Sequence, residues 1–256
     1  MKVFQTIIAV VLGALLIYAE ADFPAWASSK SPANAGELSQ YYIKNIYDET
    51  LVPNMVTAVL ADYRGYDTLF ETVVVFTAGL AIFAILGTGV MREKKTAVPA
   101  PKRIYSEPPF DLIVRISTRM LVPVIQLFAL YVLAHGHHSP GGGFQGGVIL
   151  AASFIMLELS SDLRAEAAKL THRMSIWLGI IGIVIYAGWG TLSLFFGGHF
   201  LDYDMLQALF PLDPLMARSH SMLIVEVGVA FTVSSIMLLI FRQLVSGGYS
   251  IPNKQA

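Results

Sequence analysis

The sequence contains no cysteine and little charge. Lys, Arg, Asp and Glu make up 14% of its 256 residues and 55% are hydrophobic, whereas a soluble domain has about 25% charged residues. Without cysteine the chain forms no disulfide, holds no cysteine-bound iron–sulfur cluster and performs no thiol catalysis. The formal net charge is only −1, which argues against a nucleic acid partner. The composition therefore indicates a membrane protein.

Six apolar runs are long enough, or nearly so, to cross a bilayer as helices. They cover residues 3–18, 68–90, 120–135, 144–160, 176–196 and 219–241. The first run has two interpretations, because Ala19-Glu20-Ala21 also fits a signal-peptide cleavage site; we favour a retained transmembrane helix. The prediction is an all-α polytopic membrane protein with about six transmembrane helices.

The distribution of basic residues predicts the orientation. If both termini are cytoplasmic, 13 of the 17 Lys and Arg residues fall on the cytoplasmic side. The other four are Lys30, Lys44, Arg64 and Arg218. Because cytoplasmic segments carry the excess of Lys and Arg, we predict that both termini are cytoplasmic.

Composition also divides the chain. We expect a two-helix segment over residues 1–92, a linker over 93–109, a four-helix domain over 110–245 and a tail over 246–256. The linker is basic, and its Pro99 and Pro101 interrupt any helix.

A glycine-rich stretch at residues 135–147, HGHHSPGGGFQGG, separates the third and fourth apolar runs. Pro140 cannot continue a helix, and the glycines after it accept backbone angles that other residues avoid. We therefore predict a helix end, a tight crossing and a second helix. The residues expected to shape this crossing are Gly136, Pro140, Gly141, Gly142, Gly143, Gly146 and Gly147.

Gly143, Gly147 and Ala151 repeat at every fourth position. Such a stripe of small residues allows another helix to approach closely. The alternative is a phosphate-binding glycine loop, which needs a preceding strand and a nearby Lys or Arg. The sequence offers neither, so helix packing is the favoured interpretation.

Three glutamates, Glu71, Glu158 and Glu226, fall inside apolar runs. A charge at the middle of a bilayer costs roughly 2.5–3.5 kcal/mol, so such an acid is usually protonated, paired or in contact with water. One hypothesis makes these acids part of a proton or cation path. The other makes them acids near helix ends that extend to the membrane surface or pair with an arginine of a neighbouring subunit; Glu158 stands near a helix end, with Arg164 close by. The candidates for ion translocation are Asp62, Arg64, Asp67, Glu71, Glu158 and Glu226.

Three histidines, His135, His137 and His138, crowd the start of the glycine-rich stretch. A zinc site needs three or four converging ligands, and neighbouring histidines on a turn rarely all point at one ion. His199, Asp202 and Asp204 from a later loop are an alternative source of ligands. We favour histidines that bond to loop carbonyl groups and give pH sensitivity, and we predict no metal site.

Two stretches resemble a known family. Residues 111–163, with Arg115, Thr118-Arg119, the glycine-rich stretch and the apolar helix after it, resemble the B subunit of Mrp-type multisubunit sodium/proton antiporters. This resemblance covers about residues 108–245. Residues 56–71, VTAVLADYRGYDTLFE, resemble the C-terminal end of the large A subunit of the antiporter, as well as the small E subunit of membrane-bound hydrogenases. His138 and Phe70 depart from the residues that are usual in these families.

The resemblance implies a non-catalytic membrane subunit of an Mrp-type monovalent cation (Na⁺)/proton antiporter module in a prokaryotic inner membrane, without a cofactor. The implied partners are other subunits of such an antiporter or of a membrane-bound hydrogenase, together with lipid, Na⁺ and H⁺. Three alternatives stay open: the same module in a redox-driven pump related to complex I, a purely structural helix-packing subunit, and a metal-dependent membrane hydrolase that uses the histidines.

Overall fold

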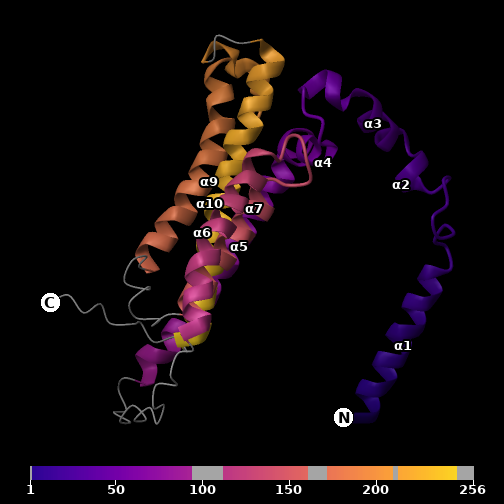
Figure 1. Ribbon diagram of the computed structural model, residues 1–256. Coiled ribbons are helices and arrows are strands. Elements are labelled where there is room, and N and C mark those ends of the chain that lie inside the picture. Colours follow the sequence, from indigo (N-terminus) through magenta and orange to yellow (C-terminus); the bar gives the residue numbers. More distant parts are fainter. Residues whose placement is uncertain (1, 94–111, 161–171, 210–212, 247–256) are drawn as a thin grey trace. The chain divides into compact units, whose positions relative to one another are not determined.

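The computed structural model describes residues 2–93, 112–160, 172–209 and 213–246. All the regular secondary structure in these ranges is helical (Figure 1). The chain divides into two compact units, Met1–Asn45 and Ile46–Ala256, and each is described by itself. Most of the predicted linker and tail lies outside the described residues, so the predicted domain boundaries stay predictions.

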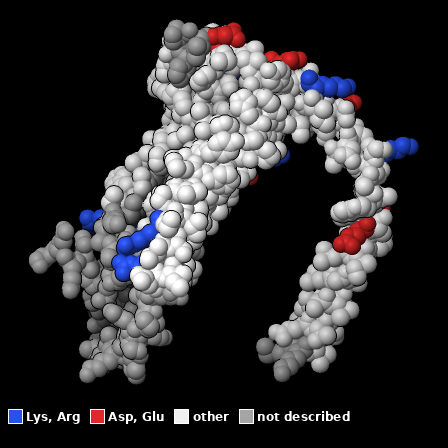
Figure 2. All heavy atoms as spheres, viewed as in Figure 1, with Lys and Arg blue, Asp and Glu red and all other residues white. Residues whose placement is uncertain are grey.

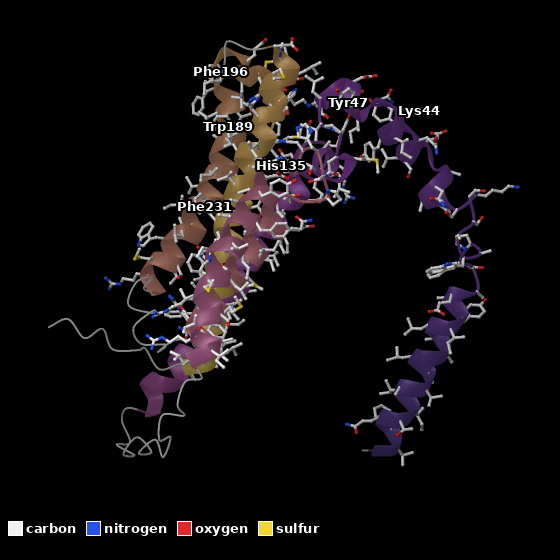
Figure 3. The ribbon with its side chains drawn as sticks, in the orientation of Figure 1. Lys44, Tyr47, His135, Trp189, Phe196 and Phe231 are labelled. Atoms are coloured by element: carbon white, nitrogen blue, oxygen red, sulfur yellow. The ribbon has the colours of Figure 1, made fainter. Side chains whose placement is uncertain are left out.

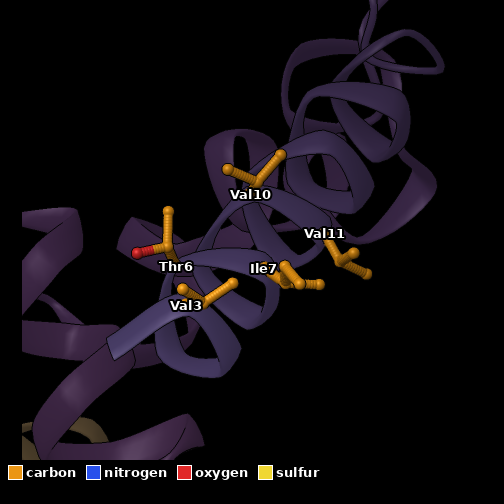
Figure 4. Close-up of a pocket in the computed structure, with 5 residues that line it drawn as sticks. All are labelled: Val3, Thr6, Ile7, Val10 and Val11. Carbon is orange, nitrogen blue, oxygen red and sulfur yellow. The ribbon is translucent and has the colours of Figure 1, made fainter. Parts of the chain in front are cut away.

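The first unit contains α1 (Lys2–Glu20), α2 (Pro32–Ala35) and the beginning of α3 (Glu37–Thr50). Pro32 begins α2 because a helix needs no amide donor at its first position. Helix α1 buries none of its residues within the chain. Val3, Ile7, Val10 and Val11 line a shallow apolar hollow along its side (Figure 4).

The second unit begins with a short helical segment that does not span. It comprises α4 (Met55–Ala58) and the π-helix η1 (Val59–Tyr63), and α5 (Gly65–Glu93) follows. Asn54 caps α4, since its side chain accepts a hydrogen bond from the amide of Val56. Val52 and Ala58 are fully buried, whereas Met55 and Val56 are exposed. One side of this segment therefore packs against the rest of the unit.

Five long helices form the bundle of this unit (Figure 1). They are α5, α6 (Leu112–Ala134), α7 (Gly143–Ser160), α9 (His172–Phe195) and α10 (Pro214–Ser246), and the 3₁₀-helix η2 (Tyr203–Ala208) precedes α10. Helix α10 contacts each of the other four and buries 61% of its apolar span. Figure 2 shows flanks of these helices that carry almost no charged side chains.

Among the described residues, six helices are long and apolar enough to cross a membrane, which confirms the predicted fold class. Helices α6 and α10 are longer than the predicted apolar runs. Helix α6 begins at Leu112 and includes Arg115 and Arg119. Helix α10 begins at Pro214, ends at Ser246 and includes Arg218 and Arg242. The positions of the termini relative to a membrane stay a prediction.

Helices α7 and α10 run parallel in a constant register. A side chain at Gly143 would meet Glu226, one at Gly147 would meet Ala230, and Glu158 pairs with Arg242. These pairs are 83, 83 and 84 positions apart. The α6–α7 crossing and the turn before α10 therefore lie at the same end of the bundle. Two residues of the small-residue stripe, Gly143 and Gly147, lie against α10.

Candidate functional site

The carboxyl group of Glu226 lies against the glycines of the crossing. Its Oε2 is 3.1 Å from the position that a Cβ atom of Gly136 would take, and its Oε1 is 2.7 Å from that of Gly142. Gly142 has a φ of +131°, which residues with a side chain rarely adopt. These glycines were predicted from the turn alone. They also make room for a buried carboxyl group, since Glu226 is only 8% exposed.

Glu226 and Glu71 line one cavity of about 240 Å³. The cavity lies among α4, η1, α5, α7, α9 and α10. Its lining consists of apolar and oxygen-bearing residues: Val56, Thr57, Leu60, Ala61, Thr68, Glu71, Thr72, Gly141, Gly143, Phe144, Gln145, Tyr186, Val225, Glu226 and Val229. None of these is Lys, Arg or His. The structure thus brings together two of the three intramembrane glutamates without a cationic side chain between them.

Asn54 and Thr57 connect the segment before α5 to the crossing. The Asn54 Nδ2 donates to the carbonyl oxygens of Gly136 at 2.7 Å and Ser139 at 2.8 Å, and the Asn54 amide donates to that of His137 at 2.9 Å. The Thr57 hydroxyl donates to Gly136 O at 2.7 Å. A buried turn has few internal partners for its carbonyl groups. These four bonds supply them and fix the crossing beside Glu226.

Asp62 pairs with Arg218, which the sequence pattern had placed in a loop. Arg218 also lies 3.5 Å from Asp204 and stacks over the ring of Tyr63 at 5.8 Å. Burial raises the pKa of Asp62 above its usual range, and the hydrogen bond from Arg218 only partly opposes this effect. Burial likewise raises the pKa of Asp204. The prediction had grouped Asp62 with Arg64.

Arg64 pairs instead with Asp67, through a bond of 2.6 Å between Arg64 Nε and Asp67 Oδ2. Both side chains are about half exposed. An exposed pair of this kind contributes little to stability. Neither residue lines the cavity of Glu71 and Glu226.

Glu158 is buried and pairs with Arg242 of α10, with 2.8 Å between Arg242 Nε and Glu158 Oε1. The two side chains are 3% and 4% exposed. The alternative considered from the sequence was an arginine of a neighbouring subunit, whereas Arg242 belongs to this chain and lies just beyond the predicted apolar run of residues 219–241. The pair lies four helical turns from the cavity along α10.

The three histidines of the crossing do not converge. His135 stacks on Tyr131 with ring centroids 4.0 Å apart and lies beside the crossing (Figure 3). His138 is exposed, whereas His137 is buried. Burial lowers the pKa of His137, and the neighbouring His138 and His220 lower it further. Within the described residues, no group of three His, Asp or Glu side chains is placed to hold a metal ion.

Comparison with known proteins identifies the family. Residues 113–239 match the model of a domain related to the MnhB subunit of Na⁺/H⁺ antiporters, and residues 3–103 match that of the E subunit of MBH. The chain is 31% identical over 143 residues to the "Putative antiporter subunit mnhB2" of Staphylococcus aureus (strain Newman), covering 55% of this chain and 97% of the relative. The chain belongs to the MnhB family of antiporter subunits.

Other relatives of this MnhB-family subunit contain both of its parts. It is 26% identical over 235 residues to the probable A/B subunit of a K(+)/H(+) antiporter from Rhizobium meliloti (strain 1021), covering 86% of the chain but only 23% of that protein. A chain of the archaeal membrane-bound sulfane sulfur reductase has a TM-score of 0.67 and 26% identity, with 95% and 97% of the two chains covered.

The Mrp complex from Dietzia sp. DQ12-45-1b supports the fold alone. One of its chains has a TM-score of 0.66 and 23% identity to this MnhB-family subunit, which covers 26% of that chain.

Four polar residues of this MnhB-family subunit were not predicted from its sequence: Asn54, Thr57, Arg218 and Arg242. Local signals existed for three of them. Asn54 stands at the position of a helix cap, Pro214 marks a helix start before Arg218, and Leu244 continues the apolar pattern beyond Arg242. The partner of Thr57 is 79 positions away, and no local pattern indicates it.

Proposed function

We propose that the chain is a non-catalytic membrane subunit of a multisubunit monovalent cation (Na⁺)/proton antiporter in a prokaryotic inner membrane. The observation that carries this proposal is the cavity that Glu71 and Glu226 both line, whose described lining contains no cationic side chain. Glu71 is exposed and Glu226 is buried, and a buried carboxylate needs a proton, a cation or water. A carboxyl group that must exchange a proton for a cation is suited to coupling the movement of H⁺ to that of Na⁺.

The test replaces each carboxyl group by an uncharged side chain of equal size. Glu71→Gln and Glu226→Gln should each lower sodium-dependent proton movement in vesicles by roughly tenfold or more, which corresponds to about 1.4 kcal/mol. The complex should still assemble, as judged by co-purification of its subunits. Glu37→Gln, on the exposed side of α3, is the matched control. Normal transport in both cavity variants would refute the proposal.

A second candidate is the same module in a redox-driven pump. It is favoured by the match of residues 3–103 to the E subunit of MBH and by the near-complete coverage of a chain from a respiratory membrane complex. The partners distinguish the two candidates. Co-purification of hydrogenase-like or iron–sulfur proteins with the tagged chain would support the pump, and co-purification of antiporter proteins only would support the first proposal.

The third candidate is a structural subunit whose acids only pair. The Glu158–Arg242 pair and the packing of Gly143 and Gly147 against α10 favour it. Under this hypothesis Glu71→Gln has no effect on transport, whereas a bulky residue at Gly147 prevents assembly.

A further inference from the structure

Hydroxyl groups line the cavity of Glu71 and Glu226, and all four donate their protons away from it. Thr57 donates to Gly136 O, Thr68 to Leu60 O, Thr72 to Thr68 O and Tyr186 to Gly65 O, at distances of 2.7–2.8 Å. A hydroxyl group has one proton and two lone pairs. Because each proton already bonds to a carbonyl oxygen, these side chains have only lone pairs to present to the cavity. The Thr57 oxygen uses one of its two lone pairs to accept a hydrogen bond from Asn54 Nδ2 at 3.0 Å, which leaves the other.

Two further side-chain oxygens lie beside Gly142. Glu226 Oε1 is 2.7 Å and Gln145 Oε1 is 3.5 Å from the position that a Cβ atom of this glycine would take. One comes from α10 and the other from α7, so the missing side chain leaves space for both. The Gln145 amide and the Glu226 carboxylate therefore face a common point.

One carboxyl oxygen of Glu226, Oε2, is buried and lacks a hydrogen-bond partner among the described residues. The hydroxyl of Thr57 is within hydrogen-bonding reach, but its proton is directed to Gly136 O. Oxygen therefore faces oxygen at this point. Such an arrangement is stable only with a positive charge or a proton between the atoms.

The charge of the site selects the class of ligand. Hard cations take oxygen ligands, and divalent ions such as Ca²⁺ are usually held by several carboxylates. This part of the cavity offers one buried carboxylate, Glu226, together with neutral oxygens from the buried Thr57 and the exposed Gln145. Its volume of about 240 Å³ leaves room for several water molecules of roughly 30 Å³ each. A single positive charge with part of its hydration shell fits both properties.

We propose that Glu226, Gln145 and Thr57 form a binding site for a partly hydrated monovalent cation. The site rests on the proposed function and deepens it, because it locates the cation where α4, α7 and α10 meet. Glu226 balances the charge. Gln145 and Thr57 replace water molecules of the hydration shell.

The test measures binding of radioactive Na⁺ to the purified complex, with choline as the inert ion and K⁺ as competitor. Glu226→Gln should remove one saturable Na⁺ site per complex. Gln145→Leu should raise the apparent Kd of that site about tenfold, as the loss of one good ligand predicts. Gln126→Leu makes the same change on α6 at a position that does not line the cavity, and should bind Na⁺ as the unaltered complex does.

The outcomes separate this inference from the proposed function. Unchanged Na⁺ binding in both Gln145→Leu and Glu226→Gln overturns the site, as does the absence of saturable binding in the unaltered complex. The proposed function still stands in that case if Glu71→Gln and Glu226→Gln lose transport. If both carboxyl variants transport normally, the proposed function fails whatever the binding data give.

Discussion

The raised pKa of Asp62 is a property of a single residue that its neighbours in the sequence do not determine. Its side chain is 7% exposed and its one described cation partner, Arg218, is 156 positions away. Burial dominates and raises its pKa. A carboxyl group whose folded-state pKa is raised binds its proton more tightly in the folded chain, so its ionisation reduces stability as the pH rises above the ordinary value.

Arg218→Gln should therefore destabilise the protein in a pH-dependent manner. It removes the interactions that lower the pKa of Asp62, so the buried carboxylate has no counter-charge at pH 8, and at pH 5 the acid takes up a proton more readily than in the unaltered protein. We expect a loss on the order of 2 kcal/mol at pH 8, below the 3–5 kcal/mol for a fully buried pair because Arg218 is partly exposed. Thermal unfolding of the detergent-solubilised complex at both pH values measures it.

The control for this prediction is Arg64→Gln. It breaks the exposed pair with Asp67, which is worth about 0–1 kcal/mol. An equal loss in Arg218→Gln at pH 5 and pH 8 would contradict the role assigned to Asp62.

Glu158 and Arg242 form the second long-range pair, and here both side chains are buried. Removing one partner takes away the opposite charge that the other faces in the buried pair, at a cost of about 3–5 kcal/mol. Glu158→Leu and Arg242→Met should each lower the unfolding temperature, and the double variant should be more stable than either single variant. Arg115→Met, on the exposed side of α6, is the control. Additive losses in the double variant would show that the two residues act independently.

At the scale of the elements, the spans and the crossing could be predicted because their signals are local. Apolar runs, Pro140 and the repeated glycines stand within one or two turns of the structure that they determine. The ends of α6 and α10 were missed, since arginine ordinarily marks the end of a span. Arg242 is tolerated inside α10 only because Glu158 lies opposite, and that proximity comes from the register of α7 and α10.

The candidate site could be predicted only in part, for a related reason. Glu71 and Glu226 were recognised because a carboxylate in an apolar run is conspicuous. Their meeting in one cavity depends on the packing of α5, α7 and α10, which no short pattern encodes. The polar neighbours Asn54, Thr57 and Gln145 have ordinary residue types, and only their hydrogen bonds and positions distinguish them.

The close approach of α7 and α10 gives a prediction for helix packing. A methyl group at Gly143 would overlap with the backbone of Glu226, whereas Gly188 in α9 has nothing within 4 Å of the corresponding position. Gly143→Ala should displace α7 and cost about 1–3 kcal/mol through overpacking. Gly188→Ala should be neutral or gain up to about 1 kcal/mol from its higher helix propensity.

The measurement is the fraction of each variant that co-purifies with its partner subunits, normalised to its amount in the membrane. Gly143→Ala should lose assembly and Gly188→Ala should keep it. Equal assembly of the two alanine variants would mean that α7 and α10 are not in close contact in the complex.

At the scale of the whole molecule, the open question is which side of the membrane the cavity faces. The parallel register of α7 and α10 places the glycine-rich crossing and the turn around His199 at the same end of the bundle. The distribution of Lys and Arg predicts that this end is the outer one. The chain has no cysteine, so a single introduced cysteine reports its own position without background.

His199→Cys, at an exposed position in the turn after α9, should react with a membrane-impermeant maleimide in intact cells. Ser106→Cys, in the predicted cytoplasmic linker, should react only after the membrane is made permeable. The reverse pattern would invert the topology. The crossing lies over Glu226 at the end of the bundle that carries His199. External labelling would therefore mean that Glu226 exchanges its ion nearer the outer surface. The Glu158–Arg242 pair would then lie toward the cytoplasm.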